Sequence, residues 1–90
     1  MSTITGYMSM CYVKCTVEDG LIASEKSVRI PTAEGGIEEV SVPAMLVEGN
    51  LVKAFFIGQD SERTLIEFPR ESSSGKWRAW VPNASVQDSK

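Results

Sequence analysis

The fold is indicated first by residues 7–21, which read YMSMCYVKCTVEDGL. From Cys11 to Val17 every second residue is apolar, and the residues between them include Tyr12, Lys14 and Thr16. Alternation of this kind is typical of a β-strand, whose successive side chains point to opposite faces. An Asp-Gly pair at 19–20 then stands between apolar residues, which is a strong signal for a hairpin turn. This stretch therefore predicts an antiparallel hairpin.

Short apolar runs separated by turn residues fill the rest of the chain. We expect further strands at about 21–30, 37–47, 51–57, 63–68 and 76–81. The turns between them fall at glycine-containing segments (34–36, 48–50 and 72–75), because glycine tolerates a positive φ. Pro31 and Pro82 end strands, and Pro43 inside the third strand indicates a bulge or an edge position.

The expected architecture is all-β. We predict a six-stranded antiparallel meander in one domain, residues 1–82, followed by a polar C-terminal tail at residues 83–90. The meander closes into a small SH3-like barrel or forms a compact sandwich, and this likeness of architecture implies no activity. A helix over 44–57 is the rival interpretation, but Gly49-Asn50 at its centre would cost more than about 1 kcal/mol.

Composition and charge narrow the functional classes. The chain is 42% hydrophobic and 23% charged, which is ordinary for a globular protein. It has no apolar run long enough for a membrane span and no basic start followed by an apolar stretch, so we expect a cytoplasmic protein without a membrane partner. The net charge of −3 argues weakly against sequence-independent binding to nucleic acid.

The basic side chains in the second half of the chain could still form a site for nucleic acid, despite the negative net charge. Residues 1–50 carry three basic and seven acidic side chains, whereas residues 51–90 carry six basic and five acidic ones. The candidates for a phosphate-binding patch are Arg63, Arg70, Lys76 and Arg78. Because Glu62, Glu67 and Glu71 lie between them, we interpret this region as a solvated surface of mixed charge.

Side chains for catalysis or metal binding are scarce. The chain has no histidine, the usual general acid or base, and neighbouring carboxylates in a strand point to opposite faces. Cys11 and Cys15 would lie roughly 13 Å apart in a strand, too far for a disulfide, and no second cysteine pair completes a metal site. We expect buried, reduced thiols, no enzymatic activity, no metal and no cofactor.

The alternation leaves a second apolar face. Choosing the less charged parity in each strand gives an inner set: Tyr7, Cys11, Val13, Cys15, Val17, Ile22, Val28, Ile30, Val40, Val42, Ala44, Leu46, Val52, Ala54, Phe56, Ile66, Phe68, Trp77, Ala79 and Val81. The other face should be polar, yet it carries Met8, Met10, Tyr12, Met45, Val47, Phe55, Ile57, Leu65 and Trp80. Aromatic residues and methionine are enriched in interface cores.

The second face leads to a functional hypothesis. We expect a non-catalytic domain that assembles with itself or with a protein partner, with Met8, Met10, Tyr12, Met45, Phe55, Ile57 and Trp80 as interface candidates. Tyr12, Phe55 and Trp80 alone could bury roughly 450–750 Å². Two alternatives stay open: strand bends that bury this set internally, and a small barrel that binds nucleic acid or a peptide through Tyr12, Trp80 and nearby basic residues.

Overall fold

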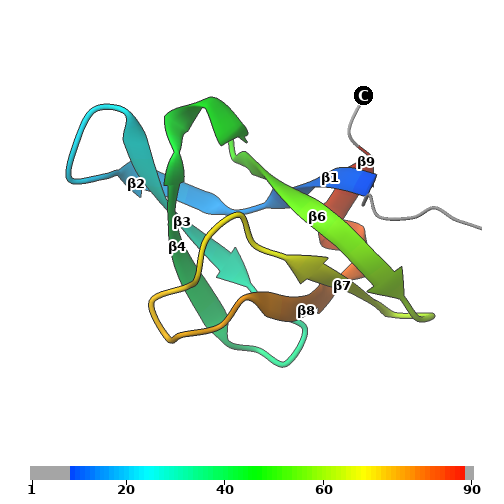
Figure 1. Cartoon of the computed structure of the whole chain (residues 1–90). Helices are drawn as coiled ribbons and strands as arrows, with labels where there is room; N and C mark the ends of the chain where they lie inside the picture. Colours follow the sequence, from blue (N-terminus) through cyan, green and yellow to red (C-terminus); the bar gives the residue numbers. More distant parts are fainter. Residues whose placement is uncertain (1–8, 89–90) are drawn as a thin grey trace, which may run out of the picture.

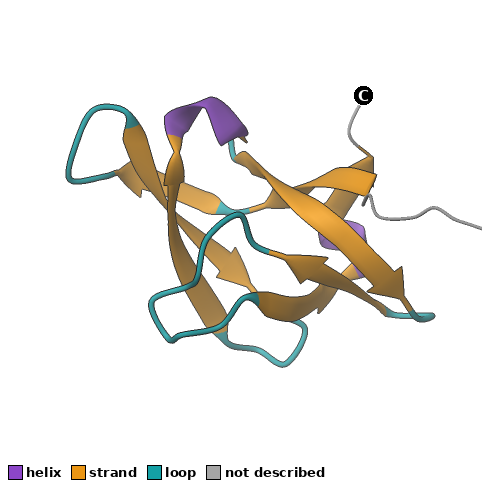
Figure 2. Cartoon of the chain, viewed as in Figure 1, coloured by secondary structure: helices purple, strands orange, loops and turns teal. Residues whose placement is uncertain are grey.

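The computed structural model describes residues 9–88 and shows two antiparallel β-sheets (Figures 1 and 2). The elements are β1 (Ser9–Lys14), β2 (Thr16–Asp19), β3 (Glu25–Pro31), β4 (Ile37–Pro43), η1 (Ala44–Leu46), β5 (Val47–Glu48), β6 (Leu51–Gln59), β7 (Arg63–Glu67), β8 (Arg78–Pro82), η2 (Asn83–Ser85) and β9 (Val86–Asp88). The large sheet has the order β8-β7-β6-β1-β9, with β5 beside β6, and the small sheet has the order β2-β3-β4. The predicted all-β class is confirmed, but within the described residues the strands do not close into a barrel.

The first predicted strand serves both sheets. It divides at Cys15, so that β1 pairs with β6 and β9 in the large sheet and β2 pairs with β3 in the small one. The break is held in place by the backbone, because the Cys15 N–H donates to the carbonyl of Asn50 at 2.9 Å. Local alternation continues through the break, which explains why the sequence pattern reads as one strand.

The hairpin after β2 has a wider loop than predicted. The backbone N–H of Gly20 donates to the Glu25 carbonyl at 3.2 Å, and the N–H of Glu25 donates to the Ile22 carbonyl at 3.1 Å. These bonds place residues 21–24 in the loop, so the second strand begins at Glu25 and the prediction that it begins at Leu21 is wrong. Pro43 lies on β4, which is an edge strand of the small sheet. The edge position is one of the two roles predicted for it.

The remaining turns largely follow the sequence signals. Gly35, Gly49 and Gly75 have φ values of 90°, 62° and 87°, a region that side-chain-bearing residues rarely adopt. The expected strand over 37–47 is interrupted by the 3₁₀ turn η1, and no α-helix forms across 44–57. Residues 83–88, which we expected to belong to a polar tail, instead form η2 and β9, and β9 pairs with β1.

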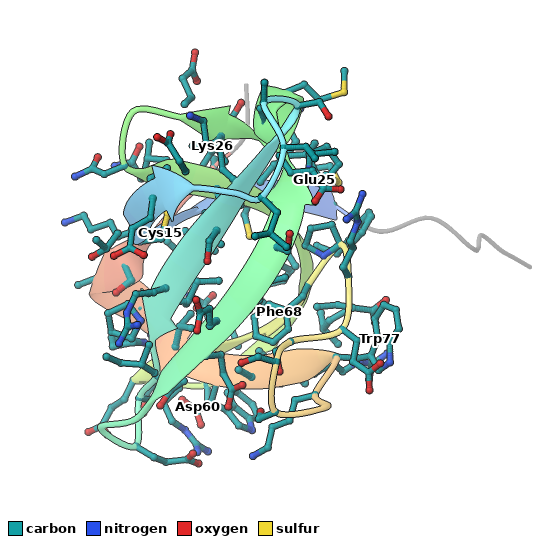
Figure 3. The ribbon with its side chains drawn as sticks, turned by 90° about the vertical axis from the view of Figure 1, so that its left-hand side faces the viewer. Cys15, Glu25, Lys26, Asp60, Phe68 and Trp77 are labelled. Atoms are coloured by element: carbon teal, nitrogen blue, oxygen red, sulfur yellow. The ribbon has the colours of Figure 1, made fainter. Side chains whose placement is uncertain are left out.

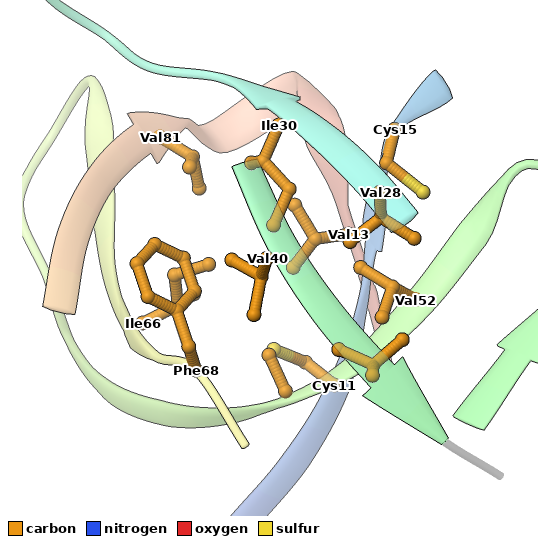
Figure 4. Packing of buried hydrophobic residues seen from close by; sticks show 12 residues of the cluster. Cys11, Val13, Cys15, Val28, Ile30, Val40, Val52, Ile66, Phe68 and Val81 are labelled. Atoms are coloured by element: carbon orange, nitrogen blue, oxygen red, sulfur yellow. The ribbon is translucent and has the colours of Figure 1, made fainter. Parts of the chain in front are cut away.

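One hydrophobic core lies between the two sheets (Figure 4). The large sheet and the residues adjoining its strands contribute Cys11, Val13, Cys15, Val52, Ala54, Ile66, Phe68 and Val81, and the small sheet contributes Val28, Ile30, Val40 and Val42. All of these were predicted to face inward. Val17, Phe56 and Ala79, from the same predicted set, are partly buried against this cluster.

The inner set also contains errors. Trp77 is 53% exposed and Ile22 is 57% exposed, so neither belongs to the core. Trp77 lies just before β8, where its carbonyl accepts the Phe68 N–H at 2.9 Å, and its side chain lies at the rim while Phe68 points inward (Figure 3). Ala44 and Leu46 fall in η1, which has no buried residue. Tyr7 lies outside the described residues.

Candidate functional site: the outer face of the large sheet

The predicted second apolar face is largely one surface, the side of the large sheet turned away from the core. We call it the outer face and define it by Met10, Tyr12, Phe55, Leu65 and Trp80, with Ile57 beside them. Met10 is directly opposite Phe55, and Leu65 is directly opposite Trp80. Directly paired side chains on one sheet face lie close enough to pack. Sequence periodicity thus placed these side chains on one side of the large sheet.

Two interface candidates do not join this surface in the structure. Met45 is 88% exposed but lies in η1, beside a hollow lined with Pro43, Ala44 and Arg70. Met8 lies outside the described residues. Ile57 stands where the pairing of β6 with β7 shifts by one residue, between Phe56 and Gly58. A bulge of this kind bends the strand and redirects the side chains around it.

Basic side chains cover the aromatic rings of the outer face. The Arg63 guanidinium carbon lies 4.2 Å from the Trp80 ring centroid, and the Lys53 ammonium lies 5.8 Å from the Tyr12 ring centroid. Both are cation–π contacts, which are favourable at exposed sites by about 0.5–1 kcal/mol. With these contacts Tyr12 and Trp80 are half-buried in the single chain. A partner would therefore bury less additional surface area on them than the sequence alone predicts.

The outer side of the small sheet has the opposite chemistry. The Ser27 hydroxyl donates to Glu39 Oε2 at 2.9 Å, and the Ser41 hydroxyl donates to Glu25 Oε1 at 3.2 Å. Glu25 also forms an ion pair with Arg70 at 2.8 Å. Along these strands, polar residues on the outer side alternate with core residues on the inner side, as expected for a sheet with one face in water. The large sheet therefore has an apolar outer side, whereas the small sheet does not.

Most of the predicted phosphate-binding side chains already have a carboxylate partner. Arg63 Nη2 lies 2.9 Å from Asp60 Oδ2, and Arg78 Nε lies 3.0 Å from Glu67 Oε1. Arg70 is held by Glu25, so three of the four predicted phosphate-binding residues have a carboxylate partner. Lys76 is the fourth, and no ion pair forms on it within the described residues. Cations neutralised in this way suit a phosphate backbone poorly.

Three carboxyl groups have a lowered pKa, and each has a structural cause. The hydrogen bond from Arg70 lowers the pKa of Glu25, and hydroxyl donors, Ser74 first, lower the pKa of Glu38. The backbone N–H groups of Glu62 and Arg63 lower the pKa of Asp60. All three are thus ionised acceptors within the fold at neutral pH. General acid catalysis instead calls for a carboxyl whose pKa is raised.

A network missed by the sequence analysis fixes the β6–β7 loop. The Thr64 hydroxyl donates to Asn83 Oδ1 at 2.6 Å, and Asn83 Nδ2 donates to the Asp60 carbonyl at 3.2 Å. The Asn83 N–H donates to the Glu62 carbonyl at 3.1 Å. The residue directly after Pro82 thereby anchors the hairpin that carries Arg63. No local pattern could have found it, because its partners lie 19 or more residues away.

The described residues offer no cluster of three or more His, Cys, Asp or Glu side chains suited to a metal ion. Burial raises the pKa of both cysteine thiols to about 11. Neither described helical turn is long and apolar enough to cross a membrane.

Comparison of the chain with protein-family models, curated proteins and solved structures finds no match.

Proposed function

We propose that the chain is a non-catalytic assembly domain that associates with a second copy of itself through the outer face. The observation that carries this proposal is the contrast between the two sheets: one outer side is a hydroxyl and carboxylate network, and the other is a stripe of methionine, leucine and aromatic side chains. The architecture in this proposal is an open form of the small SH3-like barrel, with the small sheet covering the core.

Charge supports a second copy as the partner. The outer face carries Lys53, Arg63 and Arg78 together with Glu67, so both signs are present at its margin. A two-fold dimer brings the same patch of each copy together, and a carboxylate of one copy can then face a cation of the other. Because the rings are already half-covered, the contact must extend to these margins to approach the roughly 800 Å² per partner of a standard interface.

We expect Phe55→Asp to convert the protein to a monomer. Phe55 lies on the central strand β6 opposite Met10, so an aspartate there would place a charge in the middle of the buried contact. Light scattering coupled to gel filtration should give twice the 9.8 kDa chain mass for the unmodified protein and 9.8 kDa for the variant.

Met45→Asp is the matched control. It also replaces an exposed apolar side chain by a carboxylate, but on η1, and should leave the dimer intact. Met10→Asp provides a second variant on the outer face in case Phe55→Asp fails to fold, which circular dichroism would reveal. A folded outer-face variant that still dimerises, or an unmodified protein that stays at 9.8 kDa at high micromolar concentration, would contradict the proposal.

The alternative of nucleic-acid binding is separable by salt. A protein that neutralises several phosphates loses affinity steeply as salt rises. With three arginines already ion-paired, we expect no salt-sensitive binding of a mixed-sequence single-stranded DNA oligonucleotide in a fluorescence anisotropy titration. Tight binding that collapses with added salt would favour the alternative instead.

A further inference from the structure

We propose that the loop between β7 and β8 contains a releasable strap, which lifts from the edge of β4 while the rest of the domain stays folded. We define the strap as residues 70–76. In Figures 1 and 3 the β7–β8 loop passes beside β4, an edge strand of the small sheet. The strap includes none of the residues that define the outer face, so this inference goes beyond the proposed dimer and does not depend on it.

The strap covers backbone groups that β4 would otherwise expose. Among the described strands, β4 pairs only with β3. On the other side of β4, the Glu39 carbonyl accepts the Ser73 N–H of the strap at 2.8 Å. An edge strand with unpaired N–H and C=O groups is a template for pairing with a further strand, and natural sheets often cover such an edge with a loop. The position of the strap therefore decides whether this edge is available for strand pairing.

Two carboxylates of the small sheet hold the strap. Glu38 Oε1 accepts the hydroxyl of Ser72 at 2.9 Å and the hydroxyl of Ser74 at 2.7 Å. Glu25 Oε2 lies 2.8 Å from Arg70 Nη1, at the other end of the strap. Glu38 is the second residue of β4, whereas Glu25 pairs with the last residue of that strand. The two carboxylates therefore hold the strap along the length of β4.

No apolar side chain anchors the strap. Its sequence is RESSSGK, and Ser72 is its one buried residue, at 5% exposure. Hydrogen bonds and one ion pair hold it, and water can replace such contacts at modest net cost. Phe68, two residues before the strap, is by contrast fully buried in the core. We therefore expect the strap to open without disturbing the core, as segments with few buried apolar contacts do.

Backbone hydrogen bonds within the hairpin let the strap move as a unit. The Ser72 N–H donates to the Lys76 carbonyl at 2.7 Å, which closes the turn at the end of the loop. The Phe68 N–H donates to the Trp77 carbonyl at 2.9 Å, which closes the base of the loop. Neither bond involves β4. Opening therefore breaks the backbone bond from Ser73 to β4 and the side-chain contacts, and it leaves the turn and the base in place.

Native-state hydrogen exchange followed by NMR separates strap opening from unfolding. In the unmodified protein the Ser73 N–H, corrected for its intrinsic rate, should exchange faster than the Phe68 N–H. Low concentrations of urea should leave the Ser73 rate unchanged, because strap opening exposes little surface, and should raise the Phe68 rate, because larger openings expose more. A Ser73 rate that equals the Phe68 rate and rises as steeply with urea would overturn the proposal, because the strap would then leave β4 only when the domain unfolds.

Two neighbouring glutamates show which contacts hold the strap. Glu38→Ala should raise the Ser73 exchange rate about tenfold, because the strap loses hydrogen bonds to a charged group. Glu39→Ala is the matched control: its carboxylate accepts the Ser27 hydroxyl of β3 at 2.9 Å, so its loss affects the closed and open forms alike and should leave the Ser73 rate unchanged. Ser74→Ala, which keeps Glu38, should also raise the rate and serves if circular dichroism shows that Glu38→Ala does not fold. An equal rise in both glutamate variants, or no rise in Glu38→Ala and Ser74→Ala, would overturn the proposal.

Discussion

Replacing Phe68 by alanine should lower the free energy of unfolding by about 3–5 kcal/mol, whereas Trp77→Ala should lower it by less than about 1 kcal/mol. Phe68 is the largest of the fully buried side chains, with 1% exposure, and it follows β7 into the core between the two sheets (Figure 4). Emptying that site leaves a cavity that the neighbouring strands cannot fill. For a domain whose whole stability is about 5–15 kcal/mol, the loss approaches unfolding.

Trp77 is the matched control because it is also aromatic and stands across a backbone hydrogen bond from Phe68. Its ring is 53% exposed, so truncation removes little packing. Urea unfolding followed by tryptophan fluorescence for Phe68→Ala, and by circular dichroism for Trp77→Ala, measures both. If Trp77→Ala proved the more damaging of the two, the last strand would have a different register from the one described here.

Stability should fall steeply between pH 9 and pH 11 because of Cys11 and Cys15. Burial raises both thiol pKa values from 9.0 to about 11 in the folded chain, and Asp88 adds to the shift at Cys11. Below pH 9 the thiols are protonated in both states, and the folded state keeps its full stability. As the pH rises toward 11, the unfolded chain ionises first, and each thiol costs up to about 2.7 kcal/mol of stability.

The measurement is urea unfolding at pH 8, 9, 10 and 11 on the unmodified protein and on the Cys11→Ala/Cys15→Ala double variant. The two proteins differ only at the two cysteines, so the difference between the two curves isolates the thiols. We expect a difference of about 5 kcal/mol across this range for the pair. Equal pH dependence in the two proteins would show that the thiols are not buried in the core.

Thiol labelling checks the same burial independently. A thiol reagent reacts with the thiolate, and a buried protonated cysteine exposes neither the sulfur nor the charge. We expect labelling of the native protein at pH 8 to be slow and labelling in denaturant to be fast. Rapid native labelling of either cysteine would contradict its placement between the sheets.

Which face of most strands is buried follows from the local sequence pattern. The alternation from Cys11 to Val17, and again around Val40 and Val42, correctly separated core from surface, because side-chain direction in a strand follows from the local backbone alone. Turn positions were equally local. Gly35 and Gly75 adopt a positive φ, which residues with a side chain rarely adopt. The same alternation located Met10, Phe55 and Trp80 on one shared outer face.

Where the strands end, and which sheet each one joins, depends on contacts between distant parts of the chain. Cys15 divides one apolar pattern between two sheets because Asn50, 35 residues away, accepts its N–H. Trp77 stands just outside β8, and residues 86–88 form an edge strand because β1 presents unpaired backbone groups there. A strand exists only where a partner strand meets its hydrogen bonds, and the partner's position depends on the whole chain rather than on neighbouring residues.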